Sequence, residues 1–287
     1  MADSEADGAV SGAADLRPVH HLQGEDAKWA NALLRLVAGL PLYGVEKSFK
    51  LGPGELLRDR FLVGLQPAGY AKLNLGALRA SLAMPERSFA GMAADLKRAN
   101  FLGLAYESGA RQRVFKAYVE FPVPARRLAG PTPGTVAAHL IYHGYKWDPD
   151  RGEDAALTEY WWAPELELAE IRACIAGHQA NIRRAELRAA VEQIVARCAR
   201  DCDARQFQYI EAREGAGSRV SYDLNVYAAA LPVEAVAGQL RGAARALAID
   251  AAALQALLTQ CAGRTLGHVS AGTDRHGQDF LTIYHEQ

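Results

Sequence analysis

The chain has 287 residues, of which 50% are apolar and 23% are charged, and its formal net charge is −1. A chain of this length buries about 75% of its unfolded surface when it folds, so a full core is available and disorder of the whole chain is excluded. Lys and Arg number 32 against 33 Asp and Glu, so the basic excess that is typical of nucleic-acid binders is missing. Length alone allows two domains or one closed barrel.

The cysteines and the N-terminal segment carry no strong signal. Four cysteines are too few for a disulfide framework, and Cys198 and Cys202, one helical turn apart, have no second pair of metal ligands. Residues 1–22 lack the basic and apolar regions of a signal peptide, and we expect them to form a disordered tail. No run reaches the roughly 18 apolar residues of a membrane span. We therefore expect a soluble, cytoplasmic protein in which residues 23–287 form one folded unit.

Pairs of strands joined by short turns recur along the chain, and amphipathic helices separate most of them. In chain order, the helices are predicted at 26–38, 73–82, 86–98, 165–176, 181–199, 233–247 and 251–261. The strand pairs are predicted at 45–51 with 60–66, 101–107 with 113–121, 139–147 with 157–163, 206–213 with 219–228, and 266–272 with 279–285. The pattern amounts to five units that together contain ten strands.

Short turns make each strand pair antiparallel, and hairpins that are linked through helices can close into one ring. Closure also removes the exposed sheet edges that promote aggregation. We therefore predict an α+β fold, a barrel of about ten antiparallel strands in five αα-ββ repeats, with the helices outside and a ligand site in the lumen. An eightfold β/α barrel would need single alternating strands, and no GxGxxG or GxxxxGK[ST] motif is present. The alternative is a pair of α+β domains divided near residues 128–134.

Alternation within the strands separates an apolar face from a polar face that should line the lumen. In residues 113–121, Phe115 and Val119 share the apolar face, whereas Lys116 and Tyr118 share the polar one. A hydrogen-bonding residue, a spacer and a tyrosine recur in the second strand of four hairpins. These triplets begin and end at Lys116 and Tyr118, Thr158 and Tyr160, Asn225 and Tyr227, and Thr282 and Tyr284.

A lumen lined by tyrosines suits the chemistry of a short-lived cation. The faces of aromatic rings attract cations, and packed rings keep water away from a reactive carbocation. Lys and Arg side chains beside them can hold an anion through charge-assisted hydrogen bonds. A carbocation next to a departing diphosphate is what prenyl transfer generates.

Three segments and the last strand resemble a known family. They are Pro41-Leu-Tyr-Gly-Val-Glu-Lys-Ser48, Arg60-Phe-Leu-Val-Gly-Leu-Gln-Pro67, Phe115-Lys-Ala-Tyr-Val-Glu-Phe-Pro122, and the strand that ends in Thr282-Ile-Tyr284. In order and spacing they resemble the ABBA-type, or PT-barrel, aromatic prenyltransferases, and within these the dimethylallyltryptophan synthases. The chain departs from the family at Thr158, Asn225 and Thr282, where members often carry Lys or Arg.

The resemblance implies an enzyme of secondary metabolism that transfers a dimethylallyl or geranyl group from its diphosphate to an electron-rich aromatic acceptor. The acceptor would be an indole or tryptophan-like ring, a phenol or a peptide side chain, and it would capture the carbocation. Glu46 would be the catalytic carboxylate that accepts a proton from the acceptor. The resemblance further assigns diphosphate binding to Arg60, Lys116, Asn225 and Thr282, a cation shield to Tyr118, Tyr160, Tyr227 and Tyr284, and possible pocket positions to Trp162 and His268.

No DDxxD pair is present that could chelate Mg²⁺ and diphosphate, and the acidic residues Asp148, Asp150, Glu153 and Asp154 look like solvated turn residues. The resemblance therefore implies metal-independent catalysis with no required cofactor and with Mg²⁺ as an accessory at most. The expected partners are an isoprenyl diphosphate donor and an aromatic acceptor, with no nucleic acid and no membrane, in a monomer or homodimer. The alternative is a non-catalytic protein on the same barrel that binds a small molecule or peptide.

Overall fold

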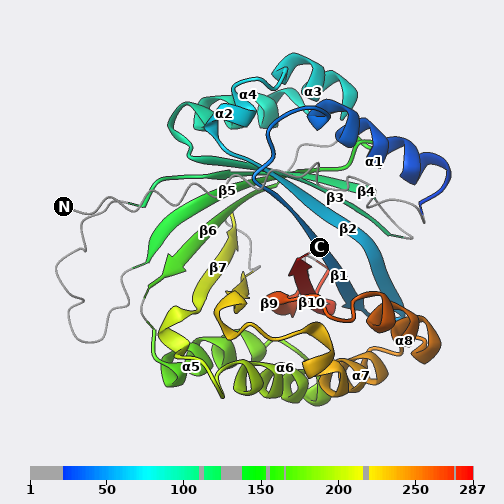
Figure 1. The fold of residues 1–287 in the computed structure, drawn as a ribbon, viewed down its shortest axis with the longest axis vertical. Coiled ribbons are helices and arrows are strands. Elements are labelled where there is room, and N and C mark those ends of the chain that lie inside the picture. Colours follow the sequence, from blue (N-terminus) through cyan, green and yellow to red (C-terminus); the bar gives the residue numbers. More distant parts are fainter. Residues whose placement is uncertain are drawn as a thin grey trace.

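The chain folds into a closed barrel of ten antiparallel strands, in the order β1-β10-β9-β8-β7-β6-β5-β4-β3-β2 (Figure 1). The computed structural model describes residues 22–109, 113–123, 138–152, 156–164, 166–215, 220–274 and 276–286. Each strand pairs with its neighbours in sequence, and the ring closes where β1 pairs with β10, from Lys47 opposite His285 to Leu51 opposite Leu281. The predicted α+β barrel is therefore confirmed.

All ten predicted strands are present. They are β1 Gly44–Gly52, β2 Glu55–Leu65, β3 Phe101–Ser108, β4 Arg113–Glu120, β5 His139–Trp147, β6 Leu157–Ala163, β7 Gln208–Glu214, β8 Val220–Asn225, β9 Leu266–Thr273 and β10 Asp279–Glu286. The prediction was wrong for the end of β8, which stops three residues early. There the Asn225 side chain accepts a hydrogen bond from the backbone N–H of Tyr227 at 3.1 Å, a local turn that competes with continued strand pairing.

The α-helices precede the first hairpin and lie between most of the later ones. They are α1 Gly24–Val37, α2 Pro67–Tyr70, α3 Leu75–Ser81, α4 Glu86–Asp95, α5 Leu168–Gln179, α6 Ala185–Cys198, α7 Ala237–Ala246 and α8 Ala251–Gln260. Side-chain caps set two of the starts, because Asn74 accepts from Ala77 N and Asp250 accepts from Ala253 N. Residues 124–137, which lead from β4 to β5, lie outside the described residues, as does the predicted tail up to residue 21.

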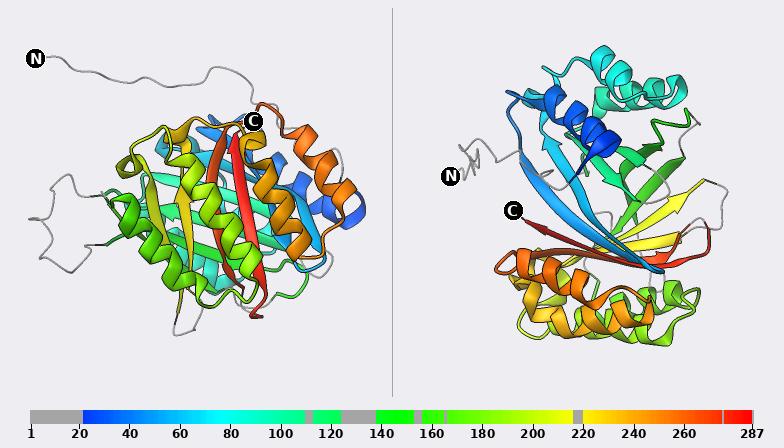
Figure 2. Two further views of the ribbon diagram at one scale, coloured as in Figure 1. Left: turned by 90° about the horizontal axis from the view of Figure 1, so that it is seen from below. Right: turned by 90° about the vertical axis from the view of Figure 1, so that its right-hand side faces the viewer.

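Two separate apolar cores flank the barrel. Helices α1 to α4 cover one side and α5 to α8 the opposite side, so the strands lie between two helical layers (Figures 1 and 2). The outward face of β4, including Phe115 and Val119, is buried in the first core, and Tyr222 and Leu281 are buried in the second. The apolar faces predicted for these strands therefore meet the helices. Within the described part of the chain, no helix is long and apolar enough to cross a membrane.

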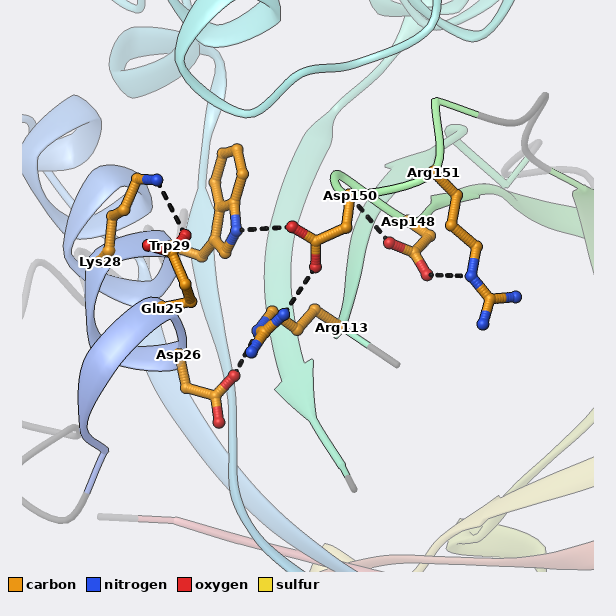
Figure 3. A network of polar contacts seen from close by, with 8 residues as sticks. All are labelled: Glu25, Asp26, Lys28, Trp29, Arg113, Asp148, Asp150 and Arg151. Atoms are coloured by element: carbon orange, nitrogen blue, oxygen red, sulfur yellow. Dashed lines mark hydrogen bonds and ion pairs between the residues drawn. The ribbon is translucent and has the colours of Figure 1, made fainter. Parts of the chain in front are cut away.

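A network of polar contacts links α1, β4 and the β5–β6 turn (Figure 3). Arg113, at the start of β4, pairs with Asp26 of α1, and its Nη1 lies 2.7 Å from Asp150 Oδ2. Trp29 Nε1 donates to Asp150 Oδ1 at 3.3 Å, and Asp148 accepts from the backbone N–H of Asp150 at 2.9 Å. Asp148 and Asp150 are turn residues, as predicted, but Asp150 in addition binds Trp29 and Arg113, whereas Glu153 and Asp154 lie outside the described residues.

A buried carboxylate fastens β10 to the start of α6. Asp279 is 1% exposed. It accepts from the backbone N–H groups of Arg183 and Arg184 at 3.2 and 3.3 Å, and Arg184 Nη1 lies 3.0 Å from it. We expect Asp279→Ala to lower the free energy of unfolding by about 3 kcal/mol, because two backbone donors and a cation lose their partner.

Thermal unfolding measures this effect, and a loss of that size lowers Tm by roughly 6 to 12 °C in a chain of this kind. Asp201→Ala is the matched control, since Asp201 is exposed and pairs only across one helical turn with Arg197. Equal Tm values for the two variants would contradict the assigned role of Asp279.

Candidate functional site

The inward faces of β1, β2, β3, β4 and β10 line a pocket in the barrel lumen. Its side chains include Glu46, Ser48, Arg60, Glu107, Lys116, Tyr118 and Tyr284. The pocket thus contains a carboxylate from β1, cations from β2 and β4, and two of the four recurring tyrosines. The structure brings together five of the residues that the sequence singled out, namely Glu46, Arg60, Lys116, Tyr118 and Tyr284.

Arg60 and Lys116 meet at a third residue, Glu107 of β3. Arg60 Nε donates to Glu107 Oε2 at 2.9 Å, and Lys116 Nζ donates to the same oxygen at 2.7 Å. All three side chains are largely buried, with exposed fractions of 7%, 14% and 12% for Arg60, Glu107 and Lys116. The two cations are therefore held side by side on a shared carboxylate oxygen.

Burial and neighbouring charges change the proton affinities of this cluster. Burial lowers the pKa of Lys116 to about 8, and the positive charges of Arg60 and Lys50 act in the same direction. Burial alone would raise the pKa of Glu107, but the charges of Lys116 and Arg60 hold it well below its usual range. Glu107 is consequently ionised at neutral pH, while Lys116 is a cation close to its titration range.

The guanidinium of Arg60 retains a donor that no side chain uses. Its Nη1 atom is buried and has no hydrogen-bond partner. Its Cζ lies 5.8 Å from the centroid of the Tyr284 ring, so the cation stands over an aromatic face in the lumen. A buried, unpaired donor costs free energy, and an anionic ligand in the pocket would satisfy it.

Tyrosines of neighbouring strands pack against each other beyond these cations. Tyr118 and Tyr160 make an edge-to-face pair with ring centroids 5.6 Å apart, and Tyr142 packs edge-on against Tyr160 at 6.2 Å. Gly144 of β5 makes room for them, because a Cβ there would lie 2.8 Å from the Tyr160 ring and 3.4 Å from that of Tyr118. This packing presents aromatic rings to the lumen.

Glu46 lies in a second polar cluster at the edge of the pocket. Tyr227 Oη donates to Glu46 Oε1 at 2.8 Å, and His268 Nε2 lies 3.8 Å from the same oxygen. The other ring nitrogen of His268, Nδ1, is hydrogen-bonded to Asp223. Burial alone would lower the pKa of His268, but Asp223 and Glu46 raise it to about 9, so the imidazole is cationic at neutral pH.

The remaining predicted residues lie elsewhere on the barrel. Asn225 of β8 bonds to Gln208 and the Tyr227 backbone and does not line the pocket. Thr282 of β10 is 2% exposed and lies opposite Ser270 of β9 and Lys50 of β1 in the strand register. It does not line the pocket either. Thr158 and Trp162 are on β6, where Thr158 Oγ1 and Trp162 Nε1 are buried without a hydrogen-bond partner. Diphosphate binding by Asn225 and Thr282 therefore gains no support from the geometry.

Sequence reasoning missed three residues of the lumen. Glu107 follows Gly103 and Ala105 on the inward face of β3, and this alternation was the available signal. Asp223 of β8 is hydrogen-bonded to His268 of β9, and this contact joins two hairpins and has no sequence signature. Tyr142 shares the inward face of β5 with Gly144 and Lys146, opposite the inward residues of β4, so simple alternation was again the available signal.

The described residues contain no group of three or more His, Cys, Asp or Glu side chains that could hold a metal ion. The cysteine pair noted in the sequence lies at the end of α6. Burial raises the pKa of Cys198 to about 12, and Cys202 Sγ contacts the backbone oxygen of Asp203 at 3.5 Å. Both thiols thus behave as ordinary helix-end residues.

No family model matches the sequence. No curated protein matches it either. Solved structures do match over most of the chain. The 5-dimethylallyltryptophan synthase from Streptomyces coelicolor covers 93% of this chain and 92% of its own, at 14% identity and a TM-score of 0.61.

A 6-dimethylallyltryptophan synthase from Micromonospora olivasterospora, in complex with DMASPP and Trp, covers 90% of both chains at 13% identity and a TM-score of 0.57. AnaPT from Neosartorya fischeri covers 91% of this chain and 86% of its own, at 13% identity and a TM-score of 0.52. The fold is that of the PT-barrel prenyltransferases. The resemblance found in the sequence is thereby confirmed for the architecture of the chain.

Proposed function

We propose that the protein is an aromatic prenyltransferase that moves a dimethylallyl group from its diphosphate to an electron-rich aromatic acceptor. The observation that carries this proposal is that one pocket contains the Arg60–Lys116 cation pair, the Tyr118 and Tyr284 rings and the Glu46 carboxylate. The pocket thus combines an anion site, an aromatic lining and a proton acceptor. The fold shared with dimethylallyltryptophan synthases supports the same reaction class.

The diphosphate of the donor would bind to Arg60 and Lys116. The unpaired Nη1 of Arg60 supplies one charge-assisted hydrogen bond, and the ammonium of Lys116 supplies another. Both stabilise the negative charge that grows as the bond between the prenyl carbon and the phosphate oxygen breaks. These cations do the work that a metal does in other diphosphate sites, so we propose that the reaction needs no metal and that Mg²⁺ is at most an accessory.

The prenyl cation would then form beside the rings of Tyr118 and Tyr284, whose faces stabilise it and whose packing limits access of water. The acceptor ring attacks the cation, a carbon–carbon or carbon–heteroatom bond forms, and the acceptor loses a proton. Glu46 is positioned by Tyr227 to accept a proton from the acceptor.

The rival proposal is a protein on the same barrel that binds an aromatic molecule or peptide without chemistry. It is favoured by Glu107, which already neutralises part of the charge of Arg60 and Lys116. A binding protein would retain its aromatic ligand whether or not a prenyl diphosphate is present, and it would release no pyrophosphate.

Mass spectrometry together with pyrophosphate detection distinguishes the two. The purified protein is incubated with dimethylallyl or geranyl diphosphate and a panel of tryptophan, tyrosine, indoles, phenols and cyclic peptides, with EDTA or with Mg²⁺. We expect a product that is heavier by one prenyl group and whose formation survives EDTA. Failure to bind a non-hydrolysable prenyl diphosphate analogue would favour the rival.

Donor binding should weaken as the pH rises above about 8. The pKa of Lys116 lies near 8, since burial, Arg60 and Lys50 lower it while Glu107 raises it, so the amine loses its charge above that pH. Below pH 8 the ammonium is present and the affinity should be constant. Calorimetric titration with pyrophosphate between pH 6.5 and 9.5 measures this dependence.

The control for the pH dependence is Lys116→Arg, because a guanidinium keeps its proton throughout this range. The variant should bind pyrophosphate with little change between pH 7 and 9.5. A similar loss of affinity in the variant and the natural protein would show that another group titrates.

A further inference from the structure

We propose that Glu107 is an internal counter-anion that competes with the donor headgroup for Arg60 and Lys116, and so determines how much negative charge the pocket accepts. The inference rests on the proposed function and adds a specificity-determining residue to it. Glu107 need not touch the reacting atoms, because it acts through the two cations that it occupies.

The contacts of the pocket place Glu107 where an anion would bind. One of its oxygens accepts from both Arg60 Nε and Lys116 Nζ, at 2.9 and 2.7 Å. Glu107 lines the same pocket as both cations, and its side chain is 14% exposed. A diphosphate entering this pocket must either displace the carboxylate or lie close beside it.

Like charges held close together in a poorly solvated site repel each other strongly. The repulsion grows with the charge of the ligand, so Glu107 should disfavour a diphosphate more than a monophosphate. The unpaired Nη1 of Arg60 still offers one donor that Glu107 does not use, which explains how an anion gains a first contact. The carboxylate also returns to the cations when pyrophosphate leaves, and this would speed release of the product.

Glu107→Gln tests the proposal because the amide keeps the size and one oxygen acceptor but loses the charge. We expect the variant to bind inorganic pyrophosphate about tenfold more tightly than the natural protein does. Binding of inorganic phosphate should tighten by a smaller factor, so the preference for pyrophosphate should increase. In turnover assays the variant should be inhibited by pyrophosphate at lower concentrations.

Two further variants separate a counter-anion from a merely structural residue. Glu107→Asp keeps the charge and should stay within about threefold of the natural affinity, since most of the repulsion remains. Glu120→Gln is the matched control, because Glu120 is an inward-facing carboxylate of β4 whose partners, the amide of Asn100 at 3.4 Å and the hydroxyl of Tyr142, are neutral. We expect it to leave the preference between pyrophosphate and phosphate unchanged.

The outcomes also distinguish this inference from the function on which it rests. If the natural protein binds pyrophosphate and Glu107→Gln binds it equally or more weakly, Glu107 orders the cations and the inference is overturned alone. If neither protein binds pyrophosphate or a prenyl diphosphate, the anion site itself is wrong and both proposals fail. A greater affinity of the variant for both anions by the same factor would also overturn the specificity role.

Discussion

Arg60→Gln should reduce kcat/KM for the prenyl diphosphate by about a thousandfold, roughly 4 kcal/mol of transition-state stabilisation. Arg60 is 7% exposed, and it supplies the pocket with a fixed positive charge and an unpaired Nη1 donor. Gln supplies neither the charge nor the forked geometry with which a guanidinium binds phosphate oxygens. Steady-state kinetics with varied donor, together with calorimetric titration of pyrophosphate, measure the loss.

Arg60→Gln also removes one partner of Glu107, so the Tm of the variant must be measured together with its kinetics. The double variant Arg60→Gln with Glu107→Gln restores the balance of charge in the cluster and should melt close to the natural protein. It should still bind the donor poorly, because the guanidinium is missing. Full recovery of donor binding in the double variant would mean that Arg60 serves only to neutralise Glu107.

Loss of a cation outside the lumen provides the control for charge. Arg79 of α3 is 46% exposed and pairs with Glu86 on the helical layer. Arg79→Gln should leave kcat/KM within about twofold, since exposed ion pairs contribute little. A comparable loss in both variants would point to a general effect of net charge.

Glu46→Gln should lower kcat by about a hundredfold to a thousandfold while the affinity for pyrophosphate stays unchanged. The expected size follows from general-base catalysis by a positioned side chain. Glu46 is held by Tyr227 Oη at 2.8 Å and lies 3.8 Å from His268 Nε2, so its orientation is defined. Single-turnover measurements with saturating donor separate the loss in chemistry from any change in binding.

Two variants show whether the effect belongs to this carboxylate. Tyr227→Phe removes the hydrogen bond that orients Glu46 and should lower kcat by about tenfold, less than the loss of the base itself. Glu159→Gln changes a carboxylate of β6 whose partner is Trp161 at 3.1 Å, and it should leave turnover unaltered. Unchanged turnover in Glu46→Gln would remove Glu46 from the mechanism.

The barrel was predictable because its strands are built on regular alternation and its turns on strong local signals. Phe115 and Val119 alternate with Lys116 and Tyr118, and the structure buries the first pair against helices while the second faces the lumen. Boundaries were less predictable where side chains compete with the backbone. The Asn225 side chain ends β8, and the Asn74 cap starts α3 two residues later than the apolar pattern predicts.

The site was predictable only where its residues belong to the recurring strand triplet or to a segment that resembles the prenyltransferase family. The meeting of Arg60 with Lys116 depends on Glu107, and the environment of Glu46 depends on Asp223 through His268. Lys116 and Glu107 belong to one hairpin, but the Arg60–Glu107 and Asp223–His268 contacts join residues that are 47 and 45 positions apart, and no local pattern encodes them. Of the four triplet tyrosines, Tyr118 and Tyr284 line the pocket, whereas Tyr160 packs against Tyr118 and Tyr227 is hydrogen-bonded to Glu46.

Because the ring closes between β1 and β10, the barrel cannot be completed until the ribosome has synthesised the last strand. The two strands come from opposite ends of the chain, so the first strand must wait for the last before it gains its second neighbour. The first apolar core contains no residue of β10 and can assemble beforehand, but the second includes Leu281 and Ile283, and until the ring closes Glu46 has neither Tyr227 nor Tyr284 beside it. Such distant pairing makes folding slow, and a chain halted before β10 would have one incomplete core and no lumen in which chemistry could occur.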